Sequence, residues 1–178
     1  TCLVGSEMCI RDRTIENRST GTCWGDVHFV TFDGRKYDLQ SSGDFILAET
    51  ARKDDEWIVQ TRQEPWVYNP SVSINTAFAT LVDGQKVVFN TKFPNNRLQI
   101  DGVDFPLANG ETKSIGNSKI ERNHNKYTIK YAGNDGIIDI DDPQLIAFDH
   151  SRFLNIHIPN FDTMQGLLGN NDGDPLSL

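Results

Sequence analysis

The chain has 178 residues, 37% of them hydrophobic, and its 25 acidic against 17 basic side chains give a formal net charge of −8. This length fits a single all-β domain with a substantial hydrophobic core. The acidic balance argues against a nucleic-acid partner, which needs clustered Lys and Arg. No window is long and apolar enough for a membrane span.

The first residues do not read as part of a domain. Residue 1 is Thr rather than an initiator methionine. Residues 6–13 (SEMCIRDR) are charged where a secretion signal would be apolar. This stretch resembles translated sequencing-adaptor sequence, an origin that we also consider for residues 175–178. We therefore predict that residues 1–13 are a non-native leader. Residues 14–178 are predicted to form a single domain of a longer protein, truncated at its C-terminal loop.

The body of the chain alternates short strand-like runs with turn signals. Apolar and polar residues alternate over residues 127–131 and in most of 153–158, which is the period of a half-buried strand. Asp-Gly and Asn-Gly pairs separate the runs and favour tight hairpins. These features predict an all-β fold, an antiparallel β-sandwich or flattened barrel of many short hairpins, with minor helix only near residues 164–168. The other strand-like runs are residues 45–48, 57–62, 72–82, 86–89, 98–100, 137–140 and 145–148.

Two distant segments are rich in oxygen ligands. Residues 23–37 read CWGDVHFVTFDGRKY, and residues 166–174 read GLLGNNDGD. Taken alone, Asp33 is explained as an Asx-turn residue before Gly34. In the second segment Asn170, Asp172 and Asp174 alternate between glycines, so their side chains could converge on one hard cation. It is not an EF-hand loop, because a proline replaces the required glycine and no Glu follows.

Together these segments resemble the two ends of a von Willebrand factor type D domain, over about residues 22–174. The resemblance implies that the two ends meet and that Asp33, Asn170 and Asp172 bind calcium, with Asp174 as a hypothetical fourth ligand. It also implies a non-catalytic, extracellular or cell-surface module for adhesion or assembly. Its partner would be a protein or a surface glycan, engaged through the parent protein.

Two departures from the family pattern carry predictions of their own. Val27 stands where some members have the proline of a self-cleaving Asp-Pro bond, so no self-cleavage is expected. Leu168 stands where the family usually has a cysteine, and of Cys2, Cys9 and Cys23 only the last lies outside the leader. This predicts a disulfide-poor, microbial member of the family, with Cys23 as a buried small hydrophobe.

The alternative is a carbohydrate-binding module of β-sandwich type. Trp57, Trp66 and Tyr68 could form a flat platform that stacks on sugar rings, although the interpretation of Trp57 as a core residue is favoured. For an enzyme, the sequence offers Asp26 and His28 as a weak acid–base pair and no established catalytic motif. We therefore predict that the domain is not an enzyme.

Overall fold

The computed structural model describes residues 18–50, 57–92, 97–124, 126–132, 137–141, 153–159 and 163–177. Within these ranges the secondary structure is antiparallel β-sheet without helix. The strands are β1 Arg18–Trp24, β2 His28–Val30, β3 Lys36–Asp38, β4 Gly43–Thr50, β5 Ile58–Trp66, β6 Asn69–Val82, β7 Gln85–Asn90, β8 Leu98–Ile100, β9 Val103–Asp104, β10 Thr112–Ile115, β11 Ser118–Asn123, β12 Lys126–Lys130, β13 Ile137–Asp141, β14 Phe153–Pro159 and β15 Met164–Gln165.

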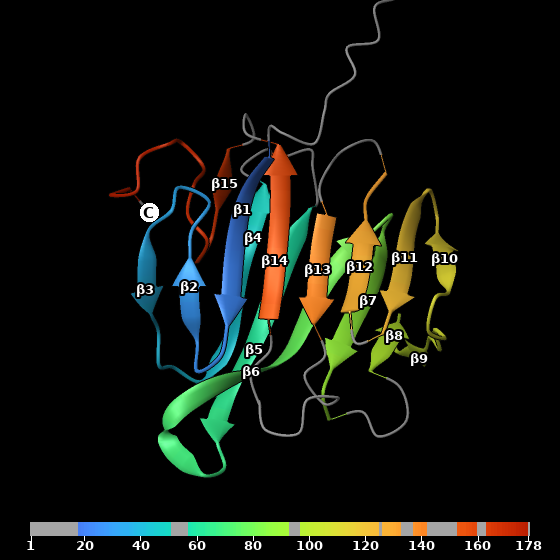
Figure 1. Cartoon of the computed structure of the whole chain (residues 1–178), viewed down its shortest axis with the longest axis horizontal. Coiled ribbons are helices and arrows are strands. Elements are labelled where there is room, and N and C mark those ends of the chain that lie inside the picture. The colour runs from blue at the N-terminus through green and yellow to red at the C-terminus, as the bar shows by residue number, and fades with distance from the viewer. Residues whose placement is uncertain are drawn as a thin grey trace, which may run out of the picture.

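The strands form two sheets that lie one over the other (Figure 1). The eight-stranded sheet has the order β10-β11-β12-β13-β14-β1-β2-β3, and the seven-stranded sheet has the order β15-β4-β5-β6-β7-β8-β9. Neither sheet closes on itself. The predicted all-β fold is therefore confirmed in its sandwich form rather than as a barrel.

Two of the predicted tight turns have the backbone that their sequence favours. Asp83 and Gly84 have φ of 48° and 76° between β6 and β7, and Asp101 and Gly102 have 49° and 80° between β8 and β9. Positive φ at both central residues matches the twist of the flanking strands. The strand predicted at residues 145–148 and the turn at residues 135–136 lie outside the described residues.

The helix predicted near residues 164–168 is wrong. Met164 and Gln165 form β15, which pairs with Thr50 and Glu49 of β4. After Gly166, two further amide groups bond to β4, because Leu167 N–H donates to Ile46 O and Leu168 N–H to Leu47 O. Since these donors face a neighbouring strand, they cannot form the bonds of a helical turn.

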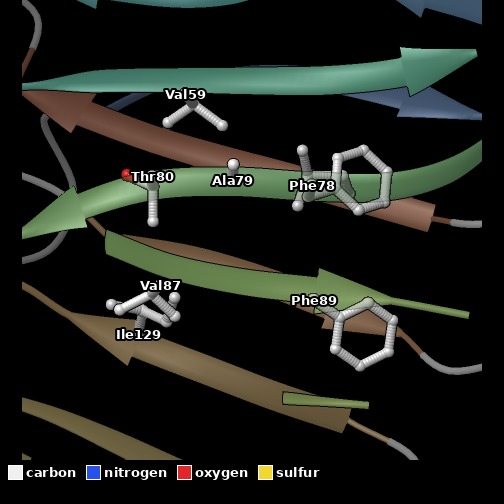
Figure 2. A pocket seen from close by; sticks show the side chains of 8 residues that line it. Val59, Phe78, Ala79, Thr80, Val87, Phe89 and Ile129 are labelled. Atoms are coloured by element: carbon white, nitrogen blue, oxygen red, sulfur yellow. The ribbon is translucent and has the colours of Figure 1, made fainter. Parts of the chain in front are cut away.

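The core lies between the sheets and is filled by apolar side chains from both. Figure 2 shows part of it, where Val59, Phe78 and Val87 of the seven-stranded sheet face Ile129 of the other. The cavity they enclose is about 10 Å³ and almost wholly apolar. A space of about one water molecule with apolar walls stays dry and offers no room for a ligand.

Candidate metal site between the first hairpin and the C-terminal loop

Asp33 lies in the turn between β2 and β3. Thr31 fixes this turn, because its N–H donates to Arg35 O (2.9 Å) and its Oγ1 accepts a hydrogen bond from Arg35 N (3.0 Å). Gly34 N–H donates to Thr31 O, and Gly34 has φ of 85°. A side chain is strained at that φ, so the glycine suits the turn. The result is a short rigid loop with the Asp33 carboxylate at its tip.

The C-terminal segment is held against this turn by hydrogen bonds to its backbone carbonyls. Phe32 N–H donates to Leu168 O (2.9 Å), and the Tyr37 hydroxyl donates to Leu167 O. On the other side the segment continues from β15, which pairs with β4. The segment is thus clamped between an edge of each sheet, near the C-terminus in Figure 1.

The Asp33 carboxylate joins the two predicted segments directly. Its Oδ2 accepts a hydrogen bond from Asn171 N (3.0 Å), and its Oδ1 accepts one from Gly173 N (2.7 Å). The bonded residues are 138 and 140 positions apart in sequence. The structure therefore brings Asp33 to the loop that carries Asn170, Asp172 and Asp174.

Within the loop, polar side chains bond to one another. Asn170 Nδ2 donates to Asp172 Oδ2 (3.0 Å), and Asp174 N–H donates to Asp172 Oδ1 (2.8 Å). The Ser177 hydroxyl contacts both Asp172 oxygens, at 3.0 and 2.9 Å. The Asp174 amide and then the Ser177 hydroxyl lower the pKa of Asp172 below its ordinary value. Asp172 is therefore held as a carboxylate.

The donor chemistry of this junction fits a hard cation such as calcium. Asp33 is half-buried and its oxygens accept one N–H each, so further lone pairs stay open to a cation. Asn170 and Asp172 offer further oxygens. No group of three acidic, His or Cys side chains with metal-binding geometry occurs among the described residues, so amide or backbone oxygens and water would have to complete the coordination. Calcium would also have to compete with Ser177 and Asn170 for Asp172.

Two contributors to this junction were not found from the sequence. Ser177 lies in residues 175–178, for which an adaptor origin is considered, and its hydroxyl bonds to Asp172. Tyr37 is the last residue of the first segment, and no role was predicted for it. Its bond to the backbone of residue 167 has no local sequence signal, because it depends on how the two ends of the chain meet.

The three predicted platform residues do not share a surface. Trp57 is 5% exposed and packs edge-on against Tyr131 in the core, which confirms the favoured interpretation, so its place on an exposed platform in the alternative is wrong. Trp66 and Tyr68 lie in the β5–β6 hairpin, which extends beyond the sandwich (Figure 1). Their rings meet at 75°, with centroids 5.6 Å apart, and so do not form one flat face.

Cys23 is fully buried and is the free cysteine among the described residues. Its Sγ accepts a hydrogen bond from Asn75 Nδ2 (2.9 Å), and Asn75 Oδ1 accepts one from the Thr61 hydroxyl (2.8 Å). Burial raises the pKa of the Cys23 thiol to about 12. As predicted, Cys23 is a buried side chain, and it stays protonated at neutral pH.

His28 forms a bridge between two carboxylates rather than half of an acid–base pair. Its Nδ1 lies 2.6 Å from Asp38 Oδ1, and its Nε2 contacts Asp26 Oδ1. The hydrogen bond to Asp38, helped by the charge of Asp26, raises the pKa of His28 above its ordinary value. The bridge ties the turn after β1 to the edge strand β3.

This bridge predicts a pH dependence of stability. The pKa of His28 is raised in the folded state, so protonated His28 stabilises the fold. This contribution to the free energy of unfolding is complete below about pH 6.5, the ordinary His pKa, and is lost as pH rises through the folded-state pKa. The imidazole is 37% exposed, so water screens the effect and we expect less than about 1 kcal/mol. His28→Gln should remove this part of the stability difference between pH 5.5 and 8.5, measured by urea unfolding. An unchanged pH profile in the variant would contradict the bridge.

Comparison with known proteins identifies the class to which this sandwich and its two joined ends belong. Residues 21–176 match the von Willebrand factor type D domain, and the chain belongs to that family. The chain is 26% identical over 168 residues to the human IgGFc-binding protein, covering 88% of this chain, and 25% identical over 182 residues to human mucin-5AC, covering 97%. It spans about 3% of the length of each of these relatives. No helix in the described residues is long and apolar enough to cross a membrane.

Proposed function

We propose that this domain is a non-catalytic structural or adhesion module of a larger extracellular protein, in which calcium ties the first hairpin to the C-terminal loop. The observation that carries the proposal is the junction at Asp33, where one carboxylate holds two amides of a loop almost 140 residues away. Membership of a family whose matched relatives include a mucin and a protein named for binding IgG Fc supports the extracellular setting.

A cation at this junction would act on stability. Asp33 and Asp172 would supply charge, and Asn170 a neutral oxygen, so three oxygen-bearing side chains would be fixed by one ion. With so few carboxylates we expect weak, extracellular-grade affinity, with a Kd on the order of 10⁻⁴ to 10⁻³ M. Binding to the folded form alone would stabilise it by about 2–3 kcal/mol at a hundredfold excess of calcium over Kd.

Thermal unfolding with EDTA, followed by calcium titration, tests this proposal. We expect a calcium-selective rise in melting temperature, with magnesium giving less because it demands smaller, octahedral geometry. Asp33→Asn should abolish most of the rise, because the amide removes the charge of the ligand that joins the two segments. Asp104→Asn is the matched control, since Asp104 lies in β9 and its carboxylate bonds to Gln99.

The outcomes separate the parts of the proposal. No calcium-selective rise in the unmodified chain would refute the metal site, and a rise that survives in Asp33→Asn would place the ion elsewhere. A rise lost in Asp33→Asn but retained in Asp104→Asn would support the ligand set.

A further inference from the structure

The outer face of the seven-stranded sheet carries a hollow of about 230 Å³, and neither Asp33 nor the C-terminal loop lines it. Its centre is built from two cross-strand rows over β5, β6 and β7. One row places Arg62, Ala77 and Asn90 side by side, and the other places Gln60, Ala79 and Val88.

The hollow exists because the middle strand presents alanines between longer neighbours. Ala77 and Ala79 end at Cβ, whereas Arg62 and Gln60 rise on one side and Asn90 on the other. Neighbouring strands lie about 4.8 Å apart, so the two walls enclose a space about two strand spacings wide. Its volume is below the roughly 300 Å³ at which pockets for drug-sized ligands begin, so a single small ring is the fitting occupant.

The Arg62 guanidinium at the edge of the hollow is paired with a carboxylate. Asp44 binds the Arg62 guanidinium through two bonds, from Nε (2.7 Å) and from Nη2 (2.8 Å). Lys86 also lines the hollow and adds one positive charge, and its backbone N–H donates to Asp101 Oδ1 (2.9 Å). An anion would compete with Asp44 for Arg62, whereas the hydroxyls of an uncharged ligand can accept from further N–H groups of Arg62 and Lys86 and leave the ion pair intact.

The remaining groups are those that bind hydroxyls. Asn90 Oδ1 accepts from Lys92 N (2.8 Å), and its Nδ2 can still donate. The exposed Gln60 amide offers both a donor and an acceptor. Ala77 and Ala79 supply an apolar floor for C–H groups.

We propose that this hollow binds one neutral pyranose ring of a glycan, with its C–H face on the alanines and its hydroxyls on Gln60, Asn90 and Arg62. The site is independent of the junction at Asp33. It also differs from the aromatic platform considered from the sequence, because Trp57, Trp66 and Tyr68 do not line it.

NMR titration of the ¹⁵N-labelled full chain tests the site. The probes are methyl α-glucopyranoside, methyl α-mannopyranoside and methyl β-galactopyranoside, with glycerol as a polyol that lacks a ring. One ring in a shallow hollow should bind with a Kd on the order of 1 mM. We expect at least one pyranoside to shift the amides of residues 60–62, 77–79 and 88–90, and glycerol to leave them unchanged.

Two variants decide whether the hollow itself binds. Ala77→Leu should fill the floor and weaken binding at least tenfold, whereas Ala108→Leu, the same change at an exposed loop position, should not. Gln60→Ala removes an exposed amide without adding volume, so it provides the test if Ala77→Leu does not fold. Absence of shifts with all three pyranosides, equal shifts with glycerol, or binding that survives in the folded variants would overturn the proposal. Because no outcome involves calcium, failure here is distinct from failure of the metal site.

Discussion

Gly166→Ala is expected to be one of the most destabilising single substitutions in this domain. Gly166 has φ of 123°, in a region that side chains rarely adopt, and an added Cβ would lie 2.8 Å from Leu47 O and 2.9 Å from Leu47 C. These atoms belong to the backbone of β4, so they cannot move aside as a flexible side chain would. We expect a loss of about 3 kcal/mol or more in the free energy of unfolding, or roughly 6–12 °C in melting temperature.

The matched control for this variant is Gly84→Ala. Gly84 also has positive φ, 76°, but nothing lies within 4 Å of an added Cβ. It should therefore cost only about 1–2 kcal/mol, from backbone conformation alone. Urea unfolding of both variants measures the difference. Equal losses would mean that Gly166 does not pack against Leu47, and the docking of the C-terminal segment on β4 would be wrong.

Leu154→Ala should cost about 2–5 kcal/mol, the usual range for truncating a buried leucine. Leu154 is fully buried on β14, between β13 and β1, and it lines the apolar cavity shown in Figure 2. Truncation would enlarge that cavity, and surrounding strands paired on both sides have little freedom to collapse into it. Urea unfolding should show a lower midpoint with the slope retained.

Leu176→Ala provides the same chemical change without burial. Leu176 is 84% exposed, so the substitution should change stability by no more than about 0.5 kcal/mol. A Leu154→Ala variant as stable as Leu176→Ala would contradict the packing of the eight-stranded sheet against its partner.

The sequence predicted the strand-rich body because strand alternation and tight-turn residues are signals within a few neighbouring residues. Residues 127–130 of the alternating run 127–131 lie in β12, and Asp83-Gly84 and Asp101-Gly102 closed hairpins with the expected positive φ. The minor helix near residues 164–168 failed for a tertiary reason. Leu167 and Leu168 in that segment donate their backbone hydrogen bonds to β4, which no local sequence window reveals.

The candidate site was likewise predicted only in part from the sequence. The sequence predicted the candidate ligand residues and the turn at Asp33, and the family resemblance implied that the two ends meet. The bonds from Asn171 and Gly173 to Asp33, the hydroxyl of Ser177 on Asp172 and the burial of Trp57 came only from the structure.

By itself, the sequence determined the β-rich class, the turn positions and the residues able to offer oxygen ligands, because these depend on side-chain chemistry and on periodicities of a few residues. The tertiary structure decided which ends meet, which aromatic residues are buried and where the alanine-floored hollow lies. Those features arise from strand order and register across two sheets, where contacts join residues up to about 140 positions apart. Pairing at that distance is set by how the whole core packs, so no local pattern encodes it.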